Sequence, residues 1–241
     1  MVRNHMKRLT VPKTWRVEKK STKYITRPKS GAHSFELGMS LNILFKDILK
    51  FCKTTKEVKA ILQDKEILVD GKRRYDYKAM IGFMDVLGIP SLKEYYRIIL
   101  NDKGNLETLK IKSNEAELKI SKIINKRALG KNKVQINMSD GRNLILKDSK
   151  YAVGDSLLIT LPKQEVKEHL KLDKGAIVTF LGGKFIGQIA TIEEVKGSII
   201  LAKITDKPIE TVKRYCFVVG EKKPAVKISG KNEQDEGDKS S

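Results

Sequence analysis

The side chains in this sequence that could do chemistry are clustered lysines and arginines, and that chemistry is the binding of phosphate groups. Three clusters follow one another: Lys46, Lys50 and Lys53, then Lys56 and Lys59, then Lys72, Arg73 and Arg74. One such cluster alone is commonly the solvated face of a helix. Three clusters on one side of a short unit favour a surface that binds a polyanion.

Two short helices are predicted to position the first two clusters. In the first helix, apolar side chains recur at steps of three and four residues, which leaves the lysines on the opposite side. This buried stripe consists of Leu41, Leu44, Phe45, Ile48, Leu49 and Cys52. Thr54 and Glu57 have the spacing of a capping box, so a second helix is predicted to start there and to bury Val58, Ile61 and Leu62.

A β-hairpin is predicted to position the third cluster. Glu66 to Val69 has the composition of a strand, and Asp70-Gly71 follows it as a turn. Both central positions of that turn need positive φ, which glycine adopts without cost and aspartate tolerates. Lys72 comes directly after the turn, so the basic run begins where the chain reverses.

The amino-acid composition limits the classes of partner that the protein is expected to bind. The chain has 241 residues, a formal net charge of +20 and a pI of about 9.8, with 40% hydrophobic residues. That apolar content is enough for more than one small core. Such an excess of positive charge requires a polyanion, and RNA or DNA is the commonest soluble one, with a membrane surface as the alternative.

The sequence predicts neither a membrane span nor a metal site nor a disulfide. No apolar run approaches the ~20 residues of a spanning helix, and no signal-peptide core follows Met1, so a soluble intracellular protein is expected. Cys52 and Cys216 lie far apart in predicted core positions and are interpreted as buried thiols. No cofactor is predicted.

Residues 1–40 are predicted to form a basic arm. The arm has too few apolar residues for a core of its own, so we expect it to be mobile in the free protein and to order against a partner. Its aromatic side chains, among them Trp15, are predicted to stack on RNA bases, while the neighbouring lysines and arginines bind phosphates. His5 and His33 are expected to contact RNA or to make local hydrogen bonds, because a metal site needs more ligands.

The remainder of the chain is predicted to be β-structure. Val134 to Met138 alternates apolar and polar residues, and Asp140-Gly141 makes a hairpin into Leu144 to Leu146, as in a half-buried antiparallel sheet. Basic residues, including Arg142, collect at the loops, where a solvated surface is as good an interpretation as an RNA contact. Asp140 and Asp155 sit near turns, where aspartate is favoured for local hydrogen bonds.

Glycines recur at short intervals after Leu172, and this pattern predicts short strands joined by tight turns in a small barrel. The run Gly182 to Gly187 contains glycines and a lysine, as a phosphate-binding loop does. Such a loop needs a helix after it, whereas Gln188 to Val195 is β-branched and predicted to be a strand. The glycine spacing instead resembles the KOW motif of SH3-like barrels, with Lys184 at the loop tip.

The predicted segments resemble known proteins in two respects. Val69-Asp70-Gly71 after two helices resembles the small RNA-binding module of ribosomal protein S4 type. The order of motifs along nearly the whole chain resembles the S4e family of small-subunit ribosomal proteins. Those motifs are the run His5 to Trp15, Val69-Asp70-Gly71, Gly82 to Val86, Asp140 to Asn143, Val153 to Ser156 and the KOW segment. Ser30 to His33 and Lys213 to Phe217 depart from the family pattern.

The resemblance implies an α+β multidomain protein. The units it implies are a basic N-terminal arm (1–40), an αα-β-hairpin RNA-binding module (41–100), a central antiparallel β domain (101–170), a C-terminal SH3-like KOW barrel (171–228) and a disordered tail (229–241). It implies a structural constituent of the small ribosomal subunit, cytoplasmic and ribosome-bound, that contacts ribosomal RNA and neighbouring ribosomal proteins. Catalysis, membrane attachment and self-association are not expected.

The side chains predicted to contact RNA come from the arm, the module and two later loops. They are Arg3, His5, Lys7, Arg8, Lys13, Trp15, Arg16, Arg27, His33, Lys46, Lys50, Lys53, Lys56, Lys59, Lys72, Arg73, Arg74, Arg142 and Lys184.

Two alternatives belong to other functional classes. An RNA-modifying enzyme with the same module would need a catalytic domain with an acid, base or nucleophile, and only small β units follow the module. A KOW-containing regulator of transcription or translation would bind RNA without residing on the ribosome. Co-sedimentation with small subunits through high salt separates a resident protein from such a factor.

Overall fold

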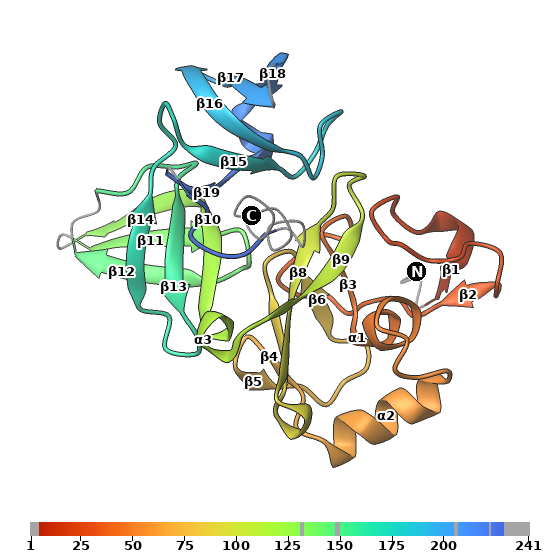
Figure 1. Ribbon diagram of the computed structural model, residues 1–241. Coiled ribbons are helices and arrows are strands. Elements are labelled where there is room, and N and C mark those ends of the chain that lie inside the picture. The colour runs from red at the N-terminus through yellow and green to blue at the C-terminus, as the bar shows by residue number, and fades with distance from the viewer. Residues whose placement is uncertain (1–4, 131–132, 148–149, 205–206, 222, 229–241) are drawn as a thin grey trace, which may run out of the picture.

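Five-stranded antiparallel sheets dominate the computed structural model, which describes residues 5–130, 133–147, 150–204, 207–221 and 223–228 (Figure 1). The described chain is mostly β-sheet with few helices, which agrees with the α-plus-β class at this coarse level. Arg3 and the predicted tail, residues 229–241, lie outside the described residues.

The helical elements are short. They are η1 (Arg8–Thr10), α1 (Leu41–Ile43), η2 (Leu44–Ile48), α2 (Thr55–Asp64), η3 (Pro90–Leu92), α3 (Ser113–Ala116) and η4 (Lys213–Tyr215). The strands before residue 112 are β1 (Met6–Lys7), β2 (Tyr24–Ile25), β3 (Gly38–Ser40), β4 (Leu68–Val69), β5 (Lys72–Arg73), β6 (Met80–Gly82), β7 (Val86–Ile89), β8 (Glu94–Leu100) and β9 (Leu106–Ile111). The later strands are β10 (Leu118–Gly130), β11 (Lys133–Met138), β12 (Asn143–Lys147), β13 (Ser156–Thr160), β14 (Val166–Leu170), β15 (Ile177–Phe180), β16 (Ile189–Lys196), β17 (Ile199–Ile204), β18 (Lys207–Val212) and β19 (Cys216–Gly220).

The first sheet has the order β5-β4-β7-β8-β9. Its β4–β5 hairpin turns at Asp70 and Gly71, with φ of 52° and 74°, so both turn positions are left-handed as the sequence predicts. The predicted strand from Glu66 is shorter, because only Leu68 and Val69 pair. β9 pairs along the length of β8, so the boundary expected at residue 100 falls between two strands of one sheet.

The first predicted helix is shorter than its apolar stripe suggests. It consists of α1 followed by one π-type segment, η2, in which the Leu49 amide donates to the Leu44 carbonyl at 2.8 Å. Lys50 has a φ of 56°, and this left-handed residue ends the helix before Cys52. Leu41, Leu44 and Phe45 of the predicted stripe are at most 1% exposed and Cys52 is also buried, whereas Ile48 and Leu49 are half-buried.

The second predicted helix, α2, starts where the capping box indicates. Thr54 Oγ1 accepts from the Glu57 amide at 3.2 Å, and Glu57 Oε2 accepts from the Lys53 amide at 2.9 Å. These bonds satisfy backbone donors that the first helical turn leaves without partners. Val58 and Leu62 are fully buried below the helix.

The N-terminal arm packs on the rest of the protein, contrary to the expectation of a mobile segment. Trp15 is 3% exposed, and its Nε1 donates to the carbonyls of Phe35 and Gly38 at 2.9 and 3.0 Å. Val11 is buried in the same core, and the Leu106 amide donates to the Thr14 carbonyl at 2.7 Å. The arm lacks a core of its own, but its few apolar side chains enter the core that the first sheet supplies.

The second sheet has the order β12-β11-β10-β13-β14. β10 belongs to two pairings, with β13 through Leu118–Lys122 and with β11 from Ile123 onward. The alternation of Val134 to Met138 gives one buried face, on which Ile136 and Met138 pack against Leu157 and Ile159. The predicted half-buried antiparallel hairpin is therefore present, formed by β11 and β12.

The third sheet has the order β18-β17-β16-β15-β19. Gly183 and Gly187 have φ of 83° and 81° in the loop that joins β15 to β16. The strand after this loop confirms that Gly182 to Gly187 is no phosphate loop followed by a helix. Phe217 from β19 contacts Phe83 edge-on at a centroid distance of 5.1 Å, so the third sheet shares a core with the first.

Two buried cations fasten the sheets together. Arg97 on β8 is fully buried, and its Nη2 donates to the carbonyls of Glu115 and Leu118 at 2.9 Å each. Lys122 on β10 donates from Nζ to the carbonyls of Lys213, Arg214 and Cys216 at 3.2, 2.9 and 2.6 Å. Cys216 and Cys52 are buried free thiols, as predicted.

Candidate nucleic-acid interface

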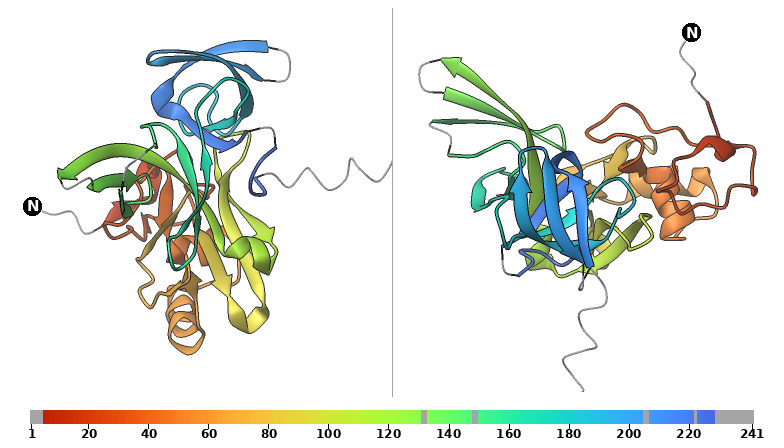
Figure 2. Two further views of the ribbon diagram at one scale, coloured as in Figure 1. Left: turned by 90° about the vertical axis from the view of Figure 1, so that its left-hand side faces the viewer. Right: turned by 90° about the horizontal axis from the view of Figure 1, so that it is seen from above.

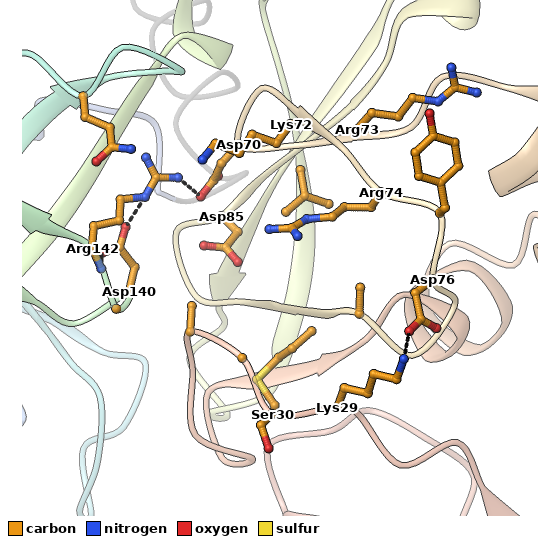
Figure 3. Close-up of a pocket in the computed structure, with 18 residues that line it drawn as sticks. Lys29, Ser30, Asp70, Lys72, Arg73, Arg74, Asp76, Asp85, Asp140 and Arg142 are labelled. Atoms are coloured by element: carbon orange, nitrogen blue, oxygen red, sulfur yellow. Dashed lines mark hydrogen bonds and ion pairs between the residues drawn. The ribbon is translucent and has the colours of Figure 1, made fainter.

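A hollow of about 550 Å³ opens beside the Asp70-Gly71 turn, and cations from separate parts of the chain line it (Figure 3). We call it the hairpin hollow. Lys29 comes from the arm, Lys72, Arg73 and Arg74 come from the β4–β5 hairpin, and Arg142 comes from the β11–β12 turn. Figure 3 shows Arg74 directed into the hollow and Arg73 directed away from it.

The hairpin holds its basic run at the rim through short-range contacts. The Arg74 amide donates to the Ile67 carbonyl at 2.9 Å, which extends the hairpin beyond its paired residues. Arg73 donates from Nη2 to the Gln63 carbonyl at 3.2 Å, and its guanidinium lies 4.7 Å from the ring centre of Tyr75. Lys72, Arg73 and Arg74 are all exposed, so their charges are available to an anionic partner.

A buried ion network forms the floor of the hairpin hollow. Lys119 on β10 is 1% exposed, and its Nζ lies 2.6 Å from Asp70 Oδ2, 2.5 Å from Asp85 Oδ1 and 3.1 Å from Asp140 Oδ2. Arg142 pairs with Asp70 at 2.7 Å and with Asp140 at 3.0 Å. We call these five residues the charge network. It joins the first sheet to the second directly below the basic hairpin.

In the charge network, the pKa values of Asp70 and Asp85 are shifted in opposite directions. Burial and the neighbouring Asp85 raise the pKa of Asp70 above its ordinary value, despite Lys119. Burial also acts to raise the pKa of Asp85, but Lys119 and His33 outweigh it and hold that pKa well below the ordinary range. Burial acts to lower the pKa of Lys119, and the three carboxylates reverse this and raise it. Lys119 therefore stays charged, and the ionised form of Asp70 is less favourable than that of Asp85.

His33 brings the arm into contact with the charge network. Its Nε2 lies 2.9 Å from both oxygens of Asp85, and both side chains are at most 6% exposed. Gly82 makes this approach possible, because a Cβ there would lie 2.4 Å from His33 Cγ. Of the two roles the sequence left open for His33, the structure supplies the local hydrogen bond.

A second hollow, of about 980 Å³, lies between the arm and the first helix. We call it the arm hollow. Lys46, Lys50, Lys53 and Arg16 line it together with acidic residues. Arg16 pairs with Glu107 at 2.7 Å, and Asp47 is bound by Arg8 at 2.9 Å. The three lysines have no carboxylate partner among the described residues, so this hollow also presents unneutralised positive charge.

The predicted basic surface is thus divided between two hollows. The first-helix lysines line the arm hollow, while Lys72, Arg73 and Arg74 line the hairpin hollow. Lys56 and Lys59 lie exposed on α2, where the Lys59 Nζ sits 4.7 Å from the ring centre of Tyr77. The sequence predicts that these cations lie on the surface, but it does not predict that they line two separate hollows.

The other predicted contacts differ in how available they are. Lys7, Lys13 and Lys184 are exposed, His5 stacks edge-on against Tyr24 at 5.5 Å, and Arg27 lies 5.7 Å from the ring centre of Phe35. Arg8 and Trp15 are 6% and 3% exposed and are held by partners within the protein. Their burial assigns them to packing the arm, so we restrict the expected RNA contacts to the exposed cations.

Sequence reasoning missed the charge network. Asp70, Asp85 and Asp140 each follow or begin a turn, and each was interpreted by its local motif alone. The available signal was Lys119, which lies between Leu118 and Ile120 in an apolar, strand-like run and is buried in the structure. A buried lysine requires carboxylate partners, and these turn aspartates were the candidates.

Neither a metal centre nor a membrane span emerges from the part of the chain that the structure describes. Within the described ranges, no group of three or more His, Cys, Asp or Glu side chains could hold a metal ion. The three carboxylates that do converge enclose the ammonium group of Lys119. None of the described helices is long and apolar enough to cross a membrane.

Comparison with known proteins gives concordant matches. Residues 92–166 match the model of the ribosomal family S4e, and residues 2–36 match that of the RS4NT domain. The chain is 34% identical over 232 residues to small ribosomal subunit protein eS4 of Methanocella arvoryzae, covering 94% of this chain and 98% of the relative. It is also 34% identical over 241 residues to small ribosomal subunit protein eS4 of Methanocaldococcus jannaschii, with the same coverage.

A solved structure resembles the fold. The crystal structure of the 30S ribosomal protein S4e from Thermoplasma acidophilum superposes with a TM-score of 0.67 at 30% sequence identity. The superposition covers 77% of this chain and 96% of that protein. Sequence and fold therefore point to the same relatives.

Proposed function

This chain belongs to the ribosomal family S4e, and from that premise we propose that it is a structural constituent of the small ribosomal subunit. As a member of a ribosomal protein family it is not an enzyme, as the sequence analysis predicts. The alternative of a KOW-containing regulator is not favoured, because the relatives are named as subunit proteins. In this role the protein is cytoplasmic and ribosome-bound, with ribosomal RNA and neighbouring ribosomal proteins as partners.

The observation that carries an RNA-binding role is the pair of cation-lined hollows. Lysines of the first helix line one of them and the basic hairpin run lines the other, on a chain of net charge +20. Phosphate oxygens suit both, because lysine and arginine donate charge-assisted hydrogen bonds to them. The β4–β5 hairpin acts as the module's RNA-facing turn, and the β15–β16 loop with Lys184 acts as the RNA-facing loop of a KOW barrel. The charge network acts as the support that fixes the hairpin hollow.

Co-sedimentation with small subunits through high salt tests residence on the ribosome. The full-length protein is expected to remain with the subunit, whereas a protein that washes off is no resident constituent. Binding to small-subunit ribosomal RNA over a salt series then tests the hollows. Affinity should fall steeply with salt, by somewhat under one unit of log–log slope per phosphate contact, with duplex DNA as the guide.

Two triple variants separate the hollows, and a third serves as their control. Lys46→Gln/Lys50→Gln/Lys53→Gln removes the free cations of the arm hollow, and Lys72→Gln/Arg73→Gln/Arg74→Gln removes the basic run of the hairpin hollow. The control removes the same charge from exposed lysines on and beside β14, as Lys163→Gln/Lys167→Gln/Lys171→Gln. Each test triple should reduce the salt slope more than the control does. Equal slopes for all three variants and the parent would refute the assignment of RNA contacts to the hollows.

A further inference from the structure

Amide side chains form rows across the outer face of the β10-β11-β12 part of the second sheet. Residues paired across antiparallel strands share one face, so the register of the strands defines these rows. Asn125 pairs with Asn137 and Asn137 with Asn143, which gives a row of three asparagines. Gln135 lies in the next outward row, between Arg127 and Ile145. We call this surface the amide face.

The amide face is the uncovered side of the sheet. The inner side of the same strands packs into the second core through Ile136 and Met138. On the outer side Ile145 is 61% exposed, and Asn125, Arg127 and Asn143 are exposed. Figure 2 shows the green strands β10 and β11 projecting beyond the rest of the protein. No described segment of the chain covers this face.

Its charge is positive, because its three strands carry basic residues and no acidic ones. Arg127, Lys133 and Lys147 lie on the outer rows and are exposed. The sequence from Leu118 to Met138 contains no aspartate or glutamate, and β12 contains none either. The hollows differ in this respect, because both are lined by acids as well as cations. Such a face is complementary to a polyanion along its whole length.

The amides on this face are held in place and still have hydrogen-bonding groups to offer. Gln135 Nε2 donates to Asn137 Oδ1 at 2.9 Å, which fixes the two side chains relative to each other. The side-chain oxygen of Gln135, Oε1, then remains as an acceptor, and the side-chain NH₂ group of Asn137 remains as a donor. A 2′-hydroxyl both donates and accepts, so it matches this pair, whereas a phosphate oxygen only accepts.

We propose that the amide face docks on the shallow minor groove of double-stranded RNA, with the amides on 2′-hydroxyls and the cations on the flanking phosphates. This inference rests on the proposed function. Double-stranded rather than single-stranded RNA is indicated because single strands are bound by stacking on aromatic rings, and β10, β11 and β12 carry none. A face of three strands is about 10 Å wide, and A-form RNA presents its 2′-hydroxyls in a wide, shallow groove.

A pair of duplex probes isolates the 2′-hydroxyl contact. The first is a blunt RNA duplex of about 16 base pairs, and the second is the same duplex with 2′-O-methyl sugars, which keeps the A-form and the phosphates but removes the hydroxyl donors. Contacts from the hollows to phosphate contribute equally to both probes and cancel in the comparison. The full-length parent protein should bind the RNA duplex more tightly than the methylated one.

The test variant is Gln135→Val/Asn137→Val, which keeps strand propensity, charge and the inner core. It should bind the RNA duplex on the order of tenfold more weakly than the parent and should no longer distinguish the two duplexes. Thr191→Val, an exposed polar-to-valine change on β16 of the third sheet, is the matched control and should retain the discrimination. Unfolding temperatures of all variants identify any loss of fold.

Several outcomes would overturn the inference without touching the proposed function. A parent that stays on the subunit through high salt but binds both duplexes equally has no 2′-hydroxyl contact at this face. A folded test variant that keeps the parent's discrimination places that contact elsewhere. Unchanged RNA binding with loss of a crosslink to a neighbouring ribosomal protein would assign the face to that protein. Loss of the parent from the subunit in high salt would instead refute the proposed function itself.

Discussion

Replacing Lys119 by methionine tests whether the charge network holds the first and second sheets together. The substitution keeps the length and apolar stem of the side chain and removes a cation that touches all three carboxylates. Removing one partner of a buried ion pair costs about 3–5 kcal/mol, because the remaining charge is left buried without compensation. Arg142 still neutralises Asp70 and Asp140, and His33 still contacts Asp85, so we expect the lower figure.

A loss of about 3 kcal/mol corresponds to a fall in Tm of roughly 6–12 °C for a chain of this size. Thermal unfolding followed by circular dichroism at pH 7 measures it. Lys110→Met is the matched control, since Lys110 is also a strand lysine paired with a glutamate, but its side chain is 64% exposed. An exposed pair contributes about 0–1 kcal/mol, so the control should lower Tm by no more than a few degrees.

A second substitution distinguishes loss of charge compensation from loss of packing. Burial and Asp85 raise the pKa of Asp70, so its ionised form is unfavourable, and neutralising it should relieve much of the destabilisation that Lys119→Met creates. The double variant Lys119→Met/Asp70→Asn should therefore be more stable than Lys119→Met alone, with a coupling energy above about 1 kcal/mol. A purely steric effect of methionine would leave the double variant no more stable than the single one.

The pH dependence has a definite sign. In the parent, the depressed pKa of Asp85 contributes stability above its unfolded pKa, about 3.9, and that contribution is lost as the pH falls further. In Lys119→Met the folded carboxylates have raised pKa values, so protonation stabilises the variant as the pH falls from 7. The Tm gap between parent and variant should narrow toward pH 4. A gap under about 2 °C at pH 7, or one that does not change with pH, would refute this reasoning.

Three further predictions concern other parts of the fold. Gly71→Val should lower Tm by several degrees in thermal unfolding, because a β-branched residue at a φ of 74° costs about 1–3 kcal/mol and its Cβ would lie 3.2 Å from Pro162; an unchanged Tm would contradict the left-handed turn. Burial lowers the pKa of Lys122 to about 8, so between pH 8 and about 10.5 this residue binds more protons in the unfolded chain than in the folded one; the unfolding free energy of the parent measured in urea should therefore rise with pH relative to that of Lys122→Met across that window. Trp15 is the single tryptophan, so native fluorescence should be blue-shifted and resistant to acrylamide, whereas a water-like spectrum would show that the arm does not pack.

The sequence predicts those features that depend on residues a few positions apart. The Thr54–Glu57 cap, the left-handed Asp70-Gly71 turn and the alternating strand Val134 to Met138 all occur as expected. Each is decided by backbone geometry and by side chains within one turn or one strand. Motif order along the chain was equally informative, because it predicted the S4e family that the comparisons confirm. The net charge of +20 is a property of composition alone.

Tertiary structure alone decides which distant side chains meet. Lys119 reaches carboxylates 49, 34 and 21 positions away, and no local pattern relates their turns to its strand. The end of the first helix at Lys50 likewise depends on packing, because periodicity continues to Cys52. Trp15 is buried because another part of the chain supplies its core. Burial and the pairing of buried charges depend on the whole fold, since desolvation is set by everything that surrounds a group, while helix caps, turns and strand alternation are set within a few bonds of it.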